Sequence, residues 1–226
     1  MAADIPAFPK IETPPSLKEM AFGTIKSSIL NHNLQPGGVY SEQAIAKELG
    51  ISKTPVHNAL VDLEARGFVK LFPRKGFQVN ALKEKDVEDM FEYRHALECA
   101  VILHVTPELT DEEIADLESM TAQAAATRDR ILFLKFDRGF HRYLTEKTEN
   151  TYIINALEHI WDLCDWVGGE IFHLGNRPEE AVAEHMAVIE KLKARDVDRA
   201  KEAMREHLEI TELRFHQLID LKESSH

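Results

Sequence analysis

Four side chains that commonly bind metals or protons occupy helix positions that the apolar pattern assigns to a protein interior. Asp137 and His141 are four residues apart, so both point from one face of a helix. His185 falls within an inward stripe of small and aliphatic residues, and His207 falls within a second such stripe. Buried imidazole and carboxylate groups need partners, so a single partner shared by all four side chains would explain their inward positions.

A shared divalent cation would satisfy all four groups. One carboxylate oxygen and three imidazole nitrogens suit Zn²⁺ first, with Ni²⁺ as an alternative, and they leave positions open for water or a ligand's carboxylate. The residues alone also allow a hydrogen-bond network without a metal. They further allow a metal-dependent enzyme of small-carboxylate metabolism that uses the Asp/His₃ site to activate water. The sequence offers no nucleophile or general-base motif to support that enzyme.

A series of helices must position these side chains. From about residue 81 the chain has no strand signal, and its apolar residues recur with a helical period. Thr110 and Glu113 form a capping-box pattern, and a further helix is predicted from Arg130 to Glu146. Six such segments predict an all-α helical bundle, in which the four candidate ligands come from three helices.

The preceding segment, residues 16–80, has a different pattern. Ser41 is expected to cap a short helix that ends at Gly50, and a second helix is expected to open with Thr54 as its cap and to end at Gly67. Two short β-type runs then flank the sequence PRKG, which predicts a hairpin with a basic tip. Two helices joined by a tight turn and followed by such a wing form a winged helix-turn-helix, whose second helix is suited to the major groove of DNA.

The charge distribution agrees with this division. The whole chain has a formal net charge of −12. Residues 1–80 carry 9 Lys+Arg and 7 Asp+Glu, a net +2, whereas residues 81–226 carry 18 and 32, a net −14. The acidic part would repel DNA phosphates, so the N-terminal part is the expected DNA-binding surface.

Composition predicts a soluble cytoplasmic protein. There is no run of about 18 apolar residues to span a membrane, and residues 1–15 form an acidic, Pro-rich leader that we expect to be flexible. The two cysteines, Cys99 and Cys164, are far apart in sequence, which argues against a disulfide framework and for a reducing compartment.

The segment LQPGGVYSEQAIAKELGISKTPVHNALVDLEARGFVKLFPRKGFQV resembles the winged helix-turn-helix of GntR-type transcriptional regulators. The resemblance implies DNA contacts from Gln43, Ser52, Lys53, Thr54, His57, Arg74 and Lys75. The family usually has arginine where this chain has Lys53 and His57, and an acidic residue at Asn58. Because lysine cannot form the forked contact that arginine makes with guanine, we expect an operator that differs from the usual family site.

The rest of the chain resembles the FCD effector domain of the FadR subfamily of GntR regulators. The phrases DxxFH, EH and REHL match the family's metal-binding pattern, which implies that Asp137, His141, His185 and His207 meet at one ion. Arg94, in EYRHALECAV, matches an arginine of the family's ligand cavity, where it would clamp a carboxylate. A surface salt bridge with Glu98, four residues on, is the alternative role for this arginine.

Together these observations predict a mainly α protein with a leader over residues 1–15, a winged helix-turn-helix over 16–80 and an all-helical FCD-type effector and dimerisation domain over 81–226. The expected function is a homodimeric regulator, in the usual mode a repressor, whose operator binding is controlled by a small organic acid at a divalent-metal site. No membrane contact and no enzymatic activity are expected. The acid, the metal and the operator are left open by the sequence.

Overall fold

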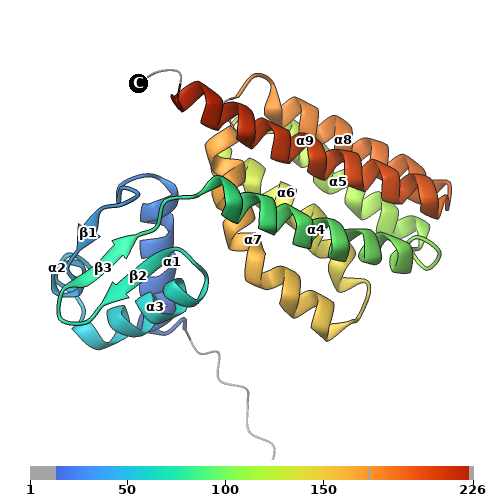
Figure 1. Cartoon of the computed structure of the whole chain (residues 1–226). Helices are drawn as coiled ribbons and strands as arrows, with labels where there is room; N and C mark the ends of the chain where they lie inside the picture. Colours follow the sequence, from blue (N-terminus) through green and yellow to red (C-terminus); the bar gives the residue numbers. More distant parts are fainter. Residues whose placement is uncertain (1–13, 173, 224–226) are drawn as a thin grey trace, which may run out of the picture. The chain divides into compact units, whose positions relative to one another are not determined.

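The computed structural model describes residues 14–172 and 174–223, and the chain divides into two compact units, Met1–Asn80 and Ala81–His226 (Figure 1). Most of the predicted leader, residues 1–13, lies outside the described residues. Each unit has its own buried core. The predicted fold class, a winged helix-turn-helix followed by a helical bundle, is confirmed.

The N-terminal unit combines three helices with a small antiparallel sheet. In chain order its elements are α1 (Leu17–Leu30), β1 (Val39–Tyr40), α2 (Glu42–Glu48), α3 (Lys53–Ala65), β2 (Val69–Phe72) and β3 (Gly76–Val79). The strand order is β1-β3-β2, so β2 and β3 form the predicted wing. The third strand, β1, was not predicted, because two residues are too few to show the alternation of apolar and polar side chains that indicates a strand.

Helix α3 is held by an inward stripe at helical spacing. Its four stripe residues are fully buried: Val56, Ala59, Leu60 and Leu63. The N-cap is Ser52, so the prediction that Thr54 caps this helix is wrong. Pro55 suggested a later start, but the first four backbone N–H groups of a helix have no intrahelical partner, and proline therefore fits anywhere in the first turn.

The wing approaches β1 too closely for a side chain at one position. Gly76 has a φ of +105°, and a Cβ there would lie 2.1 Å from the carbonyl oxygen of Tyr40. Glycine is therefore required both by the backbone conformation and by the contact between β3 and β1.

The C-terminal unit consists of the predicted series of helices (Figure 1). They are α4 (Glu84–Val105), α5 (Asp111–Ala126), α6 (Arg130–Glu146), α7 (Thr151–Ile171), α8 (Arg177–Lys193) and α9 (Val197–Glu223). The capping box at the start of α5 is present: Thr110 Oγ1 accepts from Glu113 N at 3.2 Å, and Glu113 Oε2 accepts from Thr110 N at 2.7 Å. The predicted bounds of α6 are confirmed.

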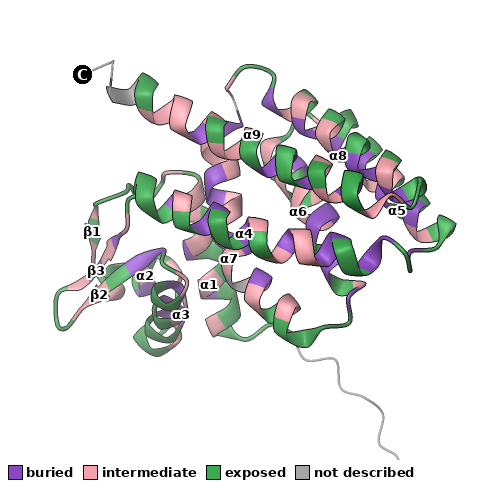
Figure 2. Ribbon diagram, turned by 45° about the vertical axis from the view of Figure 1, so that its right-hand side comes forward, coloured by how far each residue is buried: buried purple, intermediate pink, exposed green. Residues whose placement is uncertain are grey.

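Helix α6 lies at the centre of this bundle and contacts α4, α5, α7 and α8, while α9 packs against α4 and α8. The buried faces of these helices point toward one another (Figure 2). Phe140 of α6 and Trp161 of α7 are each 1% exposed in the shared core. Burying side chains of this size stabilises a fold by about 1.5–3 kcal/mol each, so the core fixes the faces of α6, α8 and α9 that meet. No helix in the described part of the chain is long and apolar enough to cross a membrane.

Candidate metal and effector site

Three histidines from three helices meet inside the C-terminal unit. His141 comes from α6, His185 from α8 and His207 from α9, and they are 3%, 2% and 2% exposed. Each offers a ring nitrogen, and these nitrogens lie within 4.8 Å of one another. Residues 66 positions apart in sequence, His141 and His207, therefore converge on one buried point.

The supporting carboxylates determine which nitrogens face this point. His141 Nδ1 lies 2.5 Å from Glu98 Oε2, and His207 Nδ1 lies 2.7 Å from Glu184 Oε2. Each Nδ1 thus faces a carboxylate oxygen, which is a hydrogen-bond acceptor, and each Nε2 is directed to the shared point. The two Nε2 atoms are 3.2 Å apart, close to the separation of about 3.3 Å for two nitrogens at about 2.0–2.1 Å from one tetrahedral zinc.

His185 supplies the strongest local sign that a cation fits. Its Nε2 is buried and has no hydrogen-bond partner among the described residues. The ring is fixed by stacking on Phe140, with centroids 4.0 Å apart and planes 12° apart. Burial, followed by the nearby His141 and Arg177, lowers the pKa of His185 to about 3 although Asp137 opposes this shift. The imidazole is thus neutral at neutral pH, as metal binding requires.

His207 has the same electrostatic character. Burial lowers its pKa well below the ordinary value, and His185 and His141 add to the effect. Uncharged imidazoles at both positions leave lone pairs, rather than positive charges, in the centre of the cluster.

Asp137 lies at the edge of the histidine cluster. Its Oδ1 is 3.7 Å from His185 Nε2, and its side chain is 29% exposed. It therefore stands apart from the tight group of three nitrogens but lines the adjoining pocket. A carboxylate at this distance is beyond hydrogen-bond range of His185.

The carboxylate that orients His141 is itself held by Arg94. Glu98 Oε1 accepts from Arg94 Nε at 2.6 Å, and Arg94 and Glu98 are 5% and 2% exposed. The alternative, a surface salt bridge between Arg94 and Glu98, is therefore half right: the ion pair exists, but it is buried. Burial opposes ionisation of Glu98, yet Arg94 and His141 together lower its pKa to about 2, so it stays charged.

A second arginine supports the carboxylate behind His207. Arg177 binds Glu184 through both Nη groups, at 2.8 and 3.0 Å, and also donates to Thr211 Oγ1 at 2.6 Å. Sequence reasoning missed Glu184, Arg177 and Thr211. Their signal was helical spacing: Thr211 is one turn beyond His207, and Glu184 is two turns beyond Arg177 on the same face.

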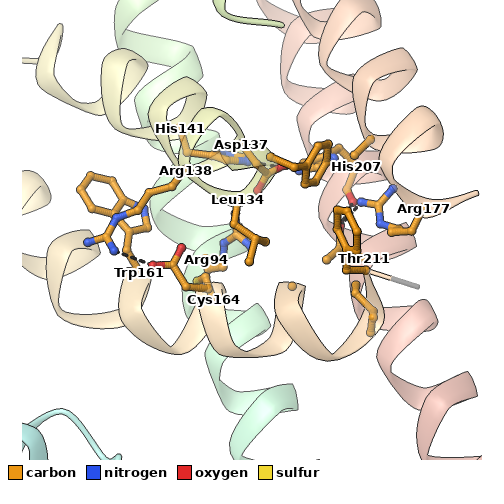
Figure 3. Close-up of a pocket in the computed structure, with 16 residues that line it drawn as sticks. Arg94, Leu134, Asp137, Arg138, His141, Trp161, Cys164, Arg177, His207 and Thr211 are labelled. Atoms are coloured by element: carbon orange, nitrogen blue, oxygen red, sulfur yellow. Dashed lines mark hydrogen bonds and ion pairs between the residues drawn. The ribbon is translucent and has the colours of Figure 1, made fainter. Parts of the chain in front are cut away.

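A pocket adjoins the cluster (Figure 3). Its empty volume is about 580 Å³, including space open to solvent. Basic, acidic and aromatic side chains line it together with two of the histidines: Arg94, Arg138, Arg177, Asp137, Asp165, Trp161, His141 and His207. Cys164 also lines it, and burial raises the pKa of this thiol to about 12, so it is uncharged.

The candidate DNA-contacting side chains are exposed on two parts of the N-terminal unit. Gln43, Ser52, Lys53, Thr54 and His57 belong to α2, α3 and the turn between them, and Arg74 and Lys75 occupy the tip of the wing.

One contact on this surface was not predicted. Glu42 Oε2 lies 3.1 Å from Lys53 Nζ, and Glu42 Oε1 lies 3.3 Å from His57 Nδ1. A carboxylate thus lies against two of the side chains expected to contact DNA, and it offsets part of the positive charge of Lys53.

Comparison with known proteins agrees with the two units. Residues 17–79 match the family model for bacterial regulatory proteins of the gntR family, and residues 89–210 match the FCD domain. The chain is 27% identical over 203 residues to the HTH-type transcriptional regulator YdhC of Bacillus subtilis, covering 88% of this chain and 90% of that protein. It is 26% identical over 196 residues to the HTH-type transcriptional repressor RspR of Escherichia coli, covering 85% and 86%.

Solved structures resemble the fold. Escherichia coli McbR/YncC aligns with a TM-score of 0.76 at 18% identity, covering 90% of this chain and 99% of that chain. The Zn²⁺-bound FCD domain of TM0439 aligns with a TM-score of 0.53 at 26% identity, covering 62% of this chain and 98% of that domain. An FCD domain can therefore bind metal.

The fold and these matches define a DNA-binding transcriptional regulator built from a winged helix-turn-helix and a helical FCD domain. The chain belongs to the GntR family, in the group that carries an FCD domain. The interpretation of the histidine site as that of a metabolic enzyme is thereby set aside, as expected from the sequence.

Proposed function

We propose that this regulator senses a small organic acid at a divalent-metal site and changes its affinity for operator DNA in response. The observation that carries the proposal is the arrangement of three buried imidazoles around one point, with the Nε2 of His185 left without a partner among the described residues. A buried ring nitrogen of this kind is unfavourable unless something binds it.

Asp137, His141, His185 and His207 would hold the ion, with zinc as the first candidate and nickel as the alternative. Three imidazoles and a carboxylate suit either metal. Glu98 and Glu184 would fix the ring orientations of His141 and His207 by accepting from their Nδ1–H groups. The bound ion would supply a Lewis-acidic position for a carboxylate oxygen.

Arg94 would hold the other side of the acid. Its Nε is engaged by Glu98, and its Nη groups make no hydrogen bond with the described residues, although Arg94 lines the pocket. A guanidinium with two free Nη groups can bind a carboxylate through paired hydrogen bonds. The buried Glu98 therefore has two tasks, since it orients both the metal ligand His141 and this arginine.

The N-terminal unit would bind operator DNA through Gln43, Ser52, Lys53, Thr54, His57, Arg74 and Lys75. Helix α3 would enter the major groove, and the basic tip of the wing would contact the neighbouring backbone. A homodimer would place two such units on half-sites about one helical turn apart. The relatives named as repressors, RspR and GlaR of Escherichia coli, support a repressor acting on cytoplasmic DNA.

Acid binding would favour one arrangement of the DNA-binding units, a coupling typically of about 1–3 kcal/mol, or about 5- to 150-fold in affinity. Linkage is reciprocal, so operator DNA must change the affinity for the acid by the same factor.

The test combines two assays on the untagged full chain. Thermal denaturation is followed with a set of organic acids, with and without a chelator, and an acid whose stabilisation disappears on chelation identifies the effector class. That acid is then added to fluorescence-anisotropy titrations with fragments from around the protein's own gene. We expect salt-sensitive, sequence-selective binding that the acid shifts. Binding that is neither sequence-selective nor affected by any acid would contradict the proposal.

A further inference from the structure

The three candidate ligand histidines differ in how their rings are held. Nδ1 of His141 and Nδ1 of His207 each face a glutamate oxygen, at 2.5 and 2.7 Å. His185 has no such support: the carboxylate paired with it, Asp137, lies 3.7 Å from Nε2, the nitrogen that has no hydrogen bond in the described part of the chain. Because His185 is only 2% exposed, its orientation comes from packing against its neighbours.

Phe140 of α6 supplies this packing. Its ring stacks on the imidazole of His185, from α8, with centroids 4.0 Å apart and planes 12° apart. The same ring meets the imidazole of His141, its neighbour in sequence, at 89° with centroids 5.4 Å apart. One phenyl ring, itself 1% exposed, therefore contacts two candidate ligands that come from different helices.

The stack on His185 has a geometry that two uncharged rings do not favour. Aromatic rings are negative on their faces and positive at their edges, so neutral pairs prefer offset or edge-to-face arrangements with centroids about 4.5–7 Å apart. Nearly parallel planes with centroids 4.0 Å apart bring the two faces together instead. A positive group over a ring face is attracted to it. An imidazole that shares its lone pair with a divalent cation gains part of the positive charge, so this stack favours a metal-bound His185 over a free one.

We infer that Phe140 is a positioning residue that raises the metal affinity of the site: it holds the ring of His185 in place and attracts the charge that this ring gains when it binds a metal. The inference rests on the proposed function, because it takes the three histidines as ligands of one divalent ion. A side chain that only fills the core stabilises the metal-free and metal-bound proteins alike, whereas Phe140 stabilises the metal-bound protein more.

The test changes the charge distribution of the ring and keeps its shape. Pentafluorophenylalanine is incorporated at position 140 of the untagged full chain, because fluorine atoms withdraw electrons from the ring face that lies against His185. The matched control is the same replacement at position 215. Phe215 belongs to the same core and is 3% exposed, and it has no ring contact with a candidate ligand among the described residues. Zinc affinity is measured by competition with a chelator, and the stability of the metal-free protein by urea denaturation with excess chelator.

We expect fluorination at position 140 to weaken zinc binding about 2- to 30-fold, the range for a cation over an aromatic face, without lowering the stability of the metal-free protein. Fluorination at position 215 should leave zinc affinity unchanged. A second pair of variants removes the rings altogether. Phe140→Leu should weaken zinc binding more than Phe215→Leu, although both remove a buried ring from one core and lower stability.

Two results would overturn this inference and leave the proposed metal site standing. One is a zinc affinity that fluorination at position 140 does not change, and the other is equal zinc affinity in Phe140→Leu and Phe215→Leu. A wild-type chain that binds no zinc would overturn the proposed metal site together with the inference.

Discussion

Replacing Glu98 by glutamine should show whether this carboxylate supports metal binding or only stabilises its helix. Glu98 accepts from Arg94 Nε at 2.6 Å and from His141 Nδ1 at 2.5 Å, and it is 2% exposed. Glutamine keeps the shape but not the charge, so His141 loses a charge-assisted hydrogen bond and Arg94 loses its buried counter-ion. Changes to a group that orients a metal ligand typically reduce metal affinity by about 10- to 100-fold, or about 1.4–2.8 kcal/mol.

The metal-free protein should also lose stability, because breaking one side of a buried ion pair typically costs about 3–5 kcal/mol. Glu146→Gln is the matched control. Arg142 Nε and Glu146 Oε1 form an i,i+4 pair of nearly the same length, 2.7 Å, but both side chains are 49% exposed. An exposed pair of this kind contributes about 0.3–0.5 kcal/mol, and it touches no candidate ligand.

Zinc affinity is measured by competition with a chromophoric chelator, and stability by urea denaturation with excess chelator. We expect Glu98→Gln to lower both and Glu146→Gln to change neither appreciably. A folded Glu98→Gln protein with wild-type zinc affinity would refute the reasoning that links this carboxylate to His141. Equal losses in the two variants would refute it as well.

Three further predictions concern the pH response, the DNA-binding surface and the wing. In chelated protein the free energy of unfolding should fall as pH drops below the ordinary histidine pKa of 6.5, because unfolded His185 and His207 each bind a proton while their folded forms stay neutral. The slope, measured by urea denaturation, is about 1.4 kcal/mol per pH unit for each histidine, and a flat profile would contradict this prediction. Glu42→Gln should free Lys53 for a phosphate contact. The slope of log affinity for DNA against log salt concentration should then become steeper by about 0.9. Anisotropy titrations measure this slope, and an unchanged slope would count against the role of Glu42. Gly76→Ala should lower the free energy of unfolding by about 1–3 kcal/mol, because the added Cβ would lie against Tyr40. Gly23→Ala is the control and should not lower it, because an added Cβ there meets nothing within 4 Å. Equal shifts of the thermal midpoint in the two variants would contradict the prediction.

Local pattern was enough to predict the elements that carry the site. The capping box at Thr110 and Glu113, the bounds of α6 and the buried stripe of α3 all follow from spacing within one helix, and the structure confirms them. The cap of α3 was wrong by two residues because Pro55 fits at several first-turn positions.

Contacts between distant segments were not predictable in the same way. Glu98 lies 43 residues from His141, and Glu184 lies 23 residues from His207. Glutamates at these positions resemble solvent-facing helix residues, because only the packing of neighbouring helices turns them inward. The convergence of α6, α8 and α9 likewise came from family resemblance and not from the residues themselves, since periodicity assigns a face to a helix but not a neighbour to that face.

The most direct test of the metal site is the zinc content of the untagged chain after equilibrium dialysis against buffered Zn²⁺, measured by elemental analysis. The comparison is with His185→Ala and with His57→Ala, a histidine exposed in the N-terminal unit. We predict one tightly bound ion per chain in the wild type and in His57→Ala, and loss of that ion in His185→Ala. Equal zinc in wild type and His185→Ala, or no bound zinc in the wild type, would contradict the account.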